Sequence, residues 1–170
     1  MPRILVKGCS GAGKTTLARA LARRFNVPHV ELDALHHGPN WTPASAHELQ
    51  ARVQLALDDT RGWVVDGNYD SKLGNLLLDR ADLIIWLDLP LRTKLSRVVA
   101  RSFRRWWLQE ELWNGNRENL STAFLGKEAL LPWTVQAHFR HRRTWPLQFR
   151  GRAVTRLQDP QEVTRWLAQL

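Results

Sequence analysis

The fold of this 170-residue chain is decided by the stretch Arg3-Ile4-Leu5-Val6-Lys7-Gly8-Cys9-Ser10-Gly11-Ala12-Gly13-Lys14-Thr15-Thr16. Residues 3–7 are a short apolar run ended by glycine, which predicts a buried strand. Residues 8–15 fit the pattern G-x-x-x-x-G-K-[ST]. Residues 14–25 predict a helix, because apolar side chains repeat there at the i, i+3, i+4 spacing of one buried face. Strand, glycine loop and helix in this order are typical of a P-loop.

A P-loop wraps the phosphates of a nucleotide in backbone N–H groups that all point inward, beside the positive end of a helix dipole. Lys14 would then neutralise the β and γ phosphates of ATP, and the hydroxyl of Thr15 would ligate Mg²⁺. A chance glycine-rich turn is the alternative, and the matching strand and helix speak against it. We expect ATP contacts along the whole loop, at Gly8, Ser10, Gly11, Ala12, Gly13, Lys14, Thr15 and Thr16.

Strand and helix patterns alternate along the rest of the chain. Apolar runs predict further strands at residues 29–32, 63–66, 83–87 and 153–155. Helices are predicted from a cap near Thr42 to about Asp59, over 91–107, over 135–143, and from Asp159-Pro160 onward. This alternation predicts an α/β fold, a three-layer P-loop NTPase fold with a mostly parallel five-stranded sheet. Its length suits a single domain over residues 1–170.

The composition agrees with a globular domain, since 44% of the residues are hydrophobic and 24% are charged. No window approaches the ~18 consecutive apolar residues of a membrane span. The apolar run Ile4-Leu5-Val6 is too short for a secretory signal. We therefore expect a cytoplasmic protein with no membrane partner. Cys9 is the one cysteine of the sequence, which excludes an intramolecular disulfide.

The positive charge is concentrated in the second half of the chain. The net charge is +9, and residues 92–152 hold 13 basic and 4 acidic side chains. Such a field attracts polyanions, whether nucleic acid or the phosphates of a small ligand. Several of the nine tryptophans stand beside arginines, a pairing that can stack bases but can equally pack a lid. No nucleic-acid-binding motif accompanies them, so we favour the small ligand and keep nucleic acid as an alternative.

Further motifs resemble known P-loop kinases. Asp66-Gly67 resembles the D-G that ends the third strand of adenylate kinase-type enzymes, and Leu87-Asp88-Leu89-Pro90 resembles the end of their fourth strand. More closely, the chain resembles the small P-loop kinase-like proteins called DNA topology modulation or FlaR-related proteins. Its matching motifs are Leu32-Asp33-Ala34-Leu35, Trp63-Val64-Val65-Asp66-Gly67-Asn68-Tyr69 and Trp86-Leu87-Asp88-Leu89-Pro90. This resemblance implies a nucleoside monophosphate kinase-like domain with an arginine-rich helical lid, which we place at residues 102–140.

The resemblance also implies roles for residues outside the P-loop. Arg97 and Arg101, at i and i+4 of one helix, would close over the transferring phosphates. Asp33 would bind the acceptor hydroxyl or serve as its base, by resemblance to shikimate and gluconate kinase-like folds. Asp66 would hold Mg²⁺ through water. Either carboxylate could instead be a cap or turn residue, and Asp88 is a third candidate of the same kind.

These features predict a phosphotransferase that moves the γ-phosphoryl group of Mg-ATP to a small-molecule acceptor, with Lys14, Arg97, Arg101 and Asp33 as catalytic residues. ATP and Mg²⁺ are the expected cofactors. Adenylate kinases carry an arginine soon after D-G, whereas this chain reads Asn68-Tyr69-Asp70, so the usual clamp on a nucleoside monophosphate is missing. The acceptor is therefore open. Two alternatives also stay open, a nucleotide-regulated nucleic-acid-binding protein and an ATPase that drives a partner.

Overall fold

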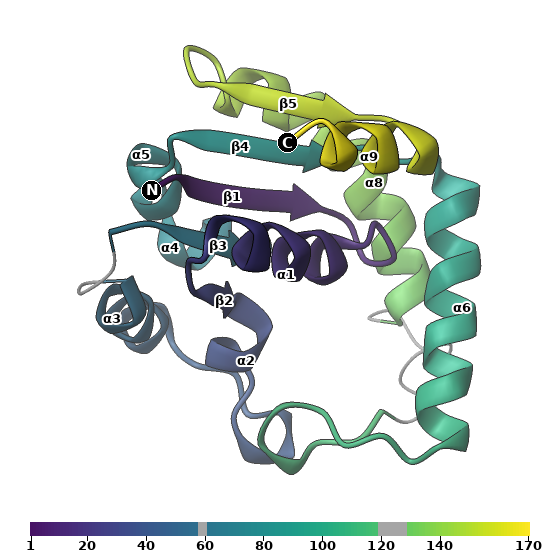
Figure 1. Cartoon of the computed structure of the whole chain (residues 1–170). Helices are drawn as coiled ribbons and strands as arrows, with labels where there is room; N and C mark the ends of the chain where they lie inside the picture. Colours follow the sequence, from purple (N-terminus) through teal and green to yellow (C-terminus); the bar gives the residue numbers. More distant parts are fainter. Residues whose placement is uncertain (58–60, 119–128) are drawn as a thin grey trace.

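The computed structural model describes residues 1–57, 61–118 and 129–170, in which strands and helices alternate along the chain (Figure 1). The strands are β1 (Arg3–Gly8), β2 (His29–Glu31), β3 (Trp63–Asp66), β4 (Leu83–Leu87) and β5 (Val154–Leu157). The helices are α1 (Lys14–Phe25), α2 (Leu32–His36), α3 (Ala46–Leu57), α4 (Asp70–Leu73), α5 (Leu76–Arg80), α6 (Leu91–Trp107), α8 (Leu130–Gln148) and α9 (Pro160–Ala168), with short 3-10 turns η1 (Pro39–Trp41) and η2 (Trp113–Gly115). None of the helices in these ranges is both long and apolar enough to cross a membrane.

Within the described ranges, the five strands form one sheet in the order β2-β3-β1-β4-β5, and every neighbouring pair is parallel. β1 is central: it pairs with β3 on one side and with β4 on the other. All strands therefore end at the same edge of the sheet. The P-loop follows β1 at this edge, next to the point where the strand order reverses, which is where open α/β sheets bind ligands. The predicted α/β fold with a five-stranded parallel sheet is confirmed.

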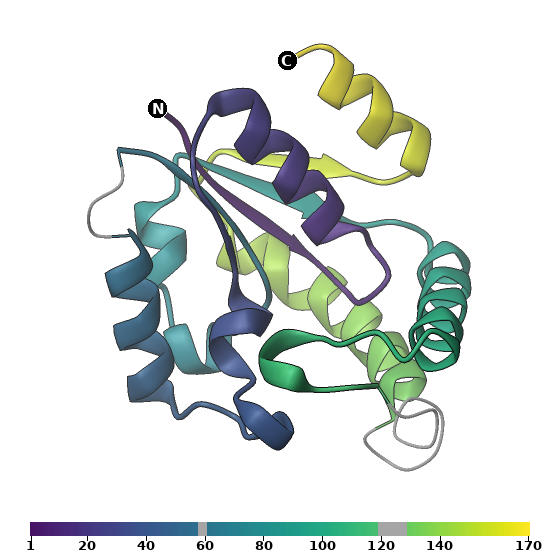
Figure 2. The ribbon, with the colours of Figure 1, turned by 60° about the horizontal axis from the view of Figure 1, so that its bottom comes forward.

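Helices cover both faces of the sheet, so the fold has three layers. Figure 1 shows α1 and α9 in front of the strands and α8 behind them, and Figure 2 shows α1 and α8 on opposite sides of β1. On one face, Ile4 and Val6 of β1 pack with buried side chains of α1. On the other face, Leu5 packs in a cluster with Trp86 and Trp145. Strands that are apolar on both faces are typical of a parallel sheet between helices.

Two of the predicted helices have different bounds. α3 begins at Ala46 and not near Thr42, because Ser45 and Glu48 form a capping box. The backbone N–H of Glu48 donates to Ser45 Oγ (3.2 Å), and that of Ser45 donates to Glu48 Oε2 (2.8 Å). The hydroxyl of Thr42 instead donates to the carbonyl of Pro39 in η1. The predicted end of this helix, Asp59, lies outside the described residues, and α8 is longer at both ends than the predicted 135–143.

The segment 102–140, which we predicted to be a lid, is described in part, since residues 119–128 lie outside the described ranges. After α6, residues 111–117 return to lie beside η1 (Figure 1). There the backbone N–H of Trp41 donates to Asn116 Oδ1 (2.8 Å), and Asn116 Nδ2 donates to the carbonyl of Gly38 (2.9 Å). The segment that follows α6 is thus tied to the segment that follows β2. The role of residues 102–140 as a lid stays a prediction.

α8 supports the P-loop through a buried histidine. The His141 ring stacks on Trp145, with 3.9 Å between ring centroids and 9° between ring planes, and its Nδ1 lies 3.5 Å from Cys9 Sγ. Burial lowers the pKa of His141 to about 3, with a further contribution from the charges of Arg140 and Lys7. The imidazole is therefore neutral in the folded protein at ordinary pH.

This buried imidazole predicts destabilisation by acid. In the unfolded chain His141 binds a proton below pH ~6.5, whereas the folded protein binds it only near pH 3. The stability present above pH 6.5 is therefore lost as the pH falls, by up to about 1.4 kcal/mol per pH unit from this residue. His141→Phe keeps an aromatic ring there and removes the titration, so urea unfolding should show a flatter pH dependence between pH 6.5 and 3. Parallel curves for the variant and the wild type would contradict this account.

Candidate active site

The P-loop turns sharply between β1 and α1 because two of its glycines have positive φ, +75° at Gly11 and +91° at Gly13. A Cβ on Gly11 would lie 2.3 Å from the carbonyl oxygen of Lys94 in α6, so the loop rests directly on that helix. Gly13 is the N-cap of α1 and makes no side-chain cap. The first N–H groups of α1 are therefore available to an anion.

A cavity of about 600 Å³ lies between the P-loop and α6. Four arginines of α6 line it, and their spacing of four, three and one residues places them on one side of the helix. The full lining is Gly11, Gly13, Lys14, Thr15, Thr16, Arg19, Glu31, Arg97, Arg101, Arg104, Arg105, Glu111, Leu112 and Trp113. Cations thus outnumber acids in this cavity. Guanidinium and ammonium groups around a glycine loop are suited to a polyphosphate.

The structure brings most of the predicted P-loop and arginine residues together at this cavity. Gly11, Gly13, Lys14, Thr15 and Thr16 meet Arg97 and Arg101 there. Gly8, Ser10 and Ala12 belong to the same loop but not to the lining of the cavity. Gly8 is held by Asn68, whose Nδ2 donates to the Gly8 carbonyl (2.6 Å) and whose Oδ1 accepts from the Gly8 N–H (3.4 Å). Asn68 therefore fixes the point at which the loop leaves β1.

Asp33 lies in α2, directly after β2 and beyond the lining of the cavity. The Tyr69 hydroxyl donates to Asp33 Oδ1 (2.7 Å), and His37 Nε2 lies 3.4 Å from the same hydroxyl. Burial, with the charge of Asp33, raises the pKa of Tyr69, so this hydroxyl stays a donor. The charge of Asp33 also acts on Arg101 and favours its protonated form. Asp33 is thus linked to the cavity through His37, which stacks on the lining residue Trp113 with 5.8 Å between ring centroids.

Asp66 and Glu31 both end strands at this edge, but they have different surroundings. Asp66 is 1% exposed, and its Oδ2 lies 2.9 Å from His29 Nε2. Glu31 lines the cavity: its Oε1 accepts from Thr15 Oγ1 (3.3 Å), and its Oε2 accepts from Arg19 (3.5 Å). Our sequence reasoning missed Glu31. Open α/β sheets bind ligands at the carboxyl ends of their strands, which is why we chose Asp33. The same argument applies to Glu31, the last residue of β2.

Asp88 is engaged in a structural ion network. It is 2% exposed, and its carboxylate accepts hydrogen bonds from Arg142 Nε (2.8 Å) and Arg156 Nη2 (2.5 Å). These contacts join the end of β4 to α8 and β5. Both carboxylate oxygens of Asp88 accept hydrogen bonds from arginines, so we do not assign Asp88 to the P-loop cavity.

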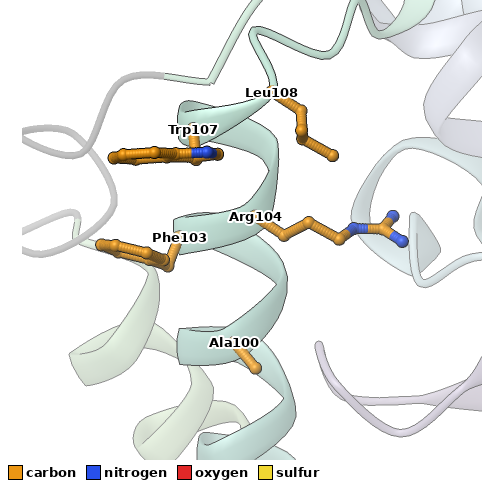
Figure 3. Close-up of a pocket in the computed structure, with 5 residues that line it drawn as sticks. All are labelled: Ala100, Phe103, Arg104, Trp107 and Leu108. Atoms are coloured by element: carbon orange, nitrogen blue, oxygen red, sulfur yellow. The ribbon is translucent and has the colours of Figure 1, made fainter.

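A second pocket, of about 460 Å³, lies on another side of α6 and is mostly apolar. Figure 3 shows Phe103 and Trp107 projecting to one side of the helix and Arg104 to the other. The Phe103 and Trp107 rings stack with 6.3 Å between centroids and 17° between planes, and they are 54% and 69% exposed. Arg104 is the charged residue of this lining. The groups suited to phosphate chemistry therefore lie at the P-loop cavity and not at this pocket.

Known proteins similar to this chain include several kinases. The cytidylate kinase of Pyrococcus abyssi (strain GE5 / Orsay) is 29% identical over 113 residues, which cover 58% of this chain and 60% of that enzyme. The chain thus spans 56 to 60% of the length of the first cytidylate kinases it matches.

Two solved structures share the fold. The shikimate kinase from Bacteroides thetaiotaomicron has a TM-score of 0.58 at 16% identity and covers 99% of this chain and 95% of its own. The deoxyadenosine kinase from M. mycoides, solved with dCMP and dCDP bound, has a TM-score of 0.56 at 12% identity and covers 98% of this chain and 95% of its own. The fold is therefore that of P-loop kinases.

The finer assignment to the DNA topology modulation (FlaR-related) proteins stays a prediction. A family model does match: "ATPase family associated with various cellular activities (AAA)" covers residues 4–88, which is half of the chain. These residues run from β1 to the end of β4 and contain the P-loop. The chain therefore belongs to the AAA family of P-loop NTPases.

Proposed function

We propose that this protein is an ATP-dependent phosphotransferase that moves the γ-phosphoryl group of Mg-ATP to a small-molecule acceptor. The observation that carries the proposal is the single cavity in which Lys14 of the P-loop meets Arg97 and Arg101 of α6. Phosphoryl transfer depends on positioning and on neutralising charge around a loose transition state, and this cavity supplies both. Residues 1–170 would act as one domain, with residues 102–140 as its lid.

The residues at the P-loop fit Mg²⁺. This ion takes hard oxygen ligands and binds through one or two protein groups together with substrate phosphates. Thr15 Oγ1 and Glu31 Oε1 are such oxygens, 3.3 Å apart at the wall of the cavity. We assign these two residues to the ion, which would neutralise charge on the β and γ phosphates. Among the described residues, no group of three or more His, Cys, Asp or Glu side chains could hold a metal.

The remaining residues would bind and orient the two substrates. The N–H groups of the P-loop and Lys14 would hold the phosphates, with Arg97 above the loop. Asp33 Oδ1 accepts from Tyr69, which fixes the carboxylate, and we assign Oδ2 to the proton of the acceptor hydroxyl. The cytidylate kinases among the relatives support a nucleotide-kinase-like transfer.

The acceptor can be found by measuring ADP formation from Mg-ATP across nucleosides, nucleoside monophosphates, sugars, sugar phosphates and hydroxy acids. We expect at least one acceptor to raise turnover well above the rate without acceptor. Intact ATP binding together with a flat panel would contradict the proposal.

Glu31→Gln is expected to raise the Mg²⁺ concentration needed for half-maximal ADP formation by about 10- to 100-fold. The amide keeps the size of the side chain but loses the charge that would attract the ion. Asp66→Asn is the matched comparison, because our sequence prediction gave the metal to Asp66. We expect its Mg²⁺ requirement to equal that of the wild type. A higher Mg²⁺ requirement in Asp66→Asn than in Glu31→Gln would instead support Asp66 as the metal ligand.

An ATPase without a small-molecule acceptor is the second candidate, and the match to the AAA family of ATPases favours it. It predicts release of inorganic phosphate from ATP with no acceptor present. A kinase with an open site would show only a slow leak by comparison. Phosphate release measured with and without acceptor therefore separates the two functions.

A further inference from the structure

Arg97 and Arg101 line the same cavity one helical turn apart, but they have different surroundings. Arg97 is exposed, and its Nη1 lies 3.7 Å from the place that a Cβ on Gly13 would occupy, directly over the P-loop. Arg101 is partly buried, and its Nε atom is buried with no hydrogen-bond partner in the described part of the chain. The two arginines are therefore placed for different tasks.

The acids near Arg101 have other partners. Glu118 accepts hydrogen bonds from the Ser102 hydroxyl and from Arg105 Nη1 (3.1 Å). Asp33 accepts from Tyr69. Within residues 1–57, 61–118 and 129–170, Arg101 forms no ion pair, while Arg105 repels it. Burial and this repulsion lower the pKa of Arg101, against the attraction of Glu118 and Asp33.

Keeping the charged Arg101 side chain partly out of water costs free energy unless an anion pairs with it. The phosphates of ATP have Lys14, Arg97 and the N-terminus of α1 at the P-loop. Arg101 shares the cavity with Trp113, and Trp113 stacks on His37. His37 lies 3.4 Å from the Tyr69 hydroxyl that donates to Asp33, the residue assigned to the acceptor hydroxyl. A neutral acceptor would leave the guanidinium unpaired, whereas a phosphate or carboxylate would match its fork of N–H donors.

We propose that the acceptor is itself anionic, carrying a phosphate or carboxylate group besides its hydroxyl or phosphoryl acceptor oxygen, and that Arg101 binds this group. The inference rests on the proposed phosphotransferase function. Trp113 lines the same cavity, and its ring stacks on His37 with 5.8 Å between centroids and 22° between planes. An apolar ring beside a partly buried guanidinium is suited to a small organic anion.

The test compares matched acceptors that differ in charge, such as a nucleoside and its monophosphate, a sugar and its phosphate, and a sugar and its acid. We expect the anionic member of a pair to raise ADP formation and the neutral member to leave it at the rate without acceptor. Arg101→Met should raise the KM for the anionic acceptor by about 10- to 100-fold and leave the KM for ATP unchanged. Arg97→Met should do the opposite, and Arg101→Lys should recover part of the loss.

Direct binding gives a second readout that needs no turnover. With a non-hydrolysable ATP analogue in the P-loop, calorimetry should detect binding of inorganic phosphate to the wild type. Arg101→Met should weaken this binding about 10- to 100-fold. Arg92→Met, which removes an exposed charge at the start of the same helix, should not change it.

The outcomes separate this inference from the proposed function. Equal turnover of a neutral acceptor and its anionic partner would overturn the inference and leave the phosphotransferase standing. A shift in the KM for ATP in Arg101→Met, with the acceptor KM unchanged, would do the same. A panel with no active acceptor and no phosphate binding would remove both.

Discussion

Replacing Lys14 by alanine is expected to lower the rate of ADP formation by about 10²- to 10³-fold, the loss typical of removing one donor that stabilises transition-state charge. Lys14 lines the cavity, and its Nζ lies 3.4 Å from the carbonyl of Cys9, a contact too weak to matter for folding. The variant should therefore fold normally. ADP formation by purified protein under saturating Mg-ATP, with thermal unfolding measured in parallel, checks both statements.

Arg24→Ala is the matched control for Lys14→Ala. Arg24 is an exposed cation in the last turn of the same helix, α1, so its loss changes the net charge equally but leaves the P-loop intact. We expect wild-type turnover from it. Unchanged turnover in Lys14→Ala would place the chemistry elsewhere on the molecule. Equal losses of turnover in both variants would mean that Lys14 acts only through the net charge of the protein.

Gly11→Ala is expected to abolish ATP binding and to lower the free energy of unfolding by about 2 to 5 kcal/mol. Two costs add. The residue has φ of +75°, which an L side chain adopts at about 1 to 2 kcal/mol. The new Cβ would also meet the Lys94 carbonyl at 2.3 Å, so the P-loop and α6 would have to move apart. Urea unfolding and calorimetric titration with ATP measure the two effects.

Gly151→Ala isolates the backbone cost. Its φ of +77° is nearly the same as that of Gly11, but a Cβ there would have nothing within 4 Å. We expect a loss of about 1 to 2 kcal/mol from strain alone and unchanged ATP binding. If Gly11→Ala were no less stable than Gly151→Ala and still bound ATP, the close packing of the P-loop on α6 would not be needed for stability or for ATP binding.

The parts of the fold set by local sequence were predictable. β1, the glycine loop and α1 follow one another within Arg3–Phe25, and their apolar periods and glycines define them without any distant contact. The start of α3 was predicted wrongly, because Thr42-Pro43 and Ser45 both carry capping signals. The reciprocal bonds of Ser45 with Glu48 decide between them.

The assignment of acids to roles depends on contacts between distant segments. Asp66 and Glu31 both end parallel strands, and position along the chain does not distinguish them. His29, one strand away, pairs with Asp66, while Thr15 of the P-loop contacts Glu31. Likewise Arg97 and Arg101 look equivalent at i and i+4. They differ because Arg97 is exposed and lies over Gly13, whereas Arg101 is partly buried and its Nε has no hydrogen-bond partner in the described part of the chain.

The basic charge of the second half has a local explanation in the cavity. Arg97, Arg101, Arg104 and Arg105 all belong to residues 92–152 and line one space above the P-loop. Two further arginines, Arg142 and Arg156, bind Asp88. Five of the thirteen basic side chains of residues 92–152 are therefore engaged with a small site or with the fold, which favours a small anionic ligand over a polyanion.

We propose that the γ-phosphoryl group leaves ATP for a second small molecule in this cavity. The most direct test of this transfer follows the label from γ-labelled ATP after incubation with Mg²⁺, the protein and the anionic acceptor that most raises ADP formation. Our account predicts label in the acceptor, in amounts equal to the ADP formed, and about 10²- to 10³-fold slower transfer with Lys14→Ala. Label recovered only as inorganic phosphate would identify an ATPase instead, and would contradict the account.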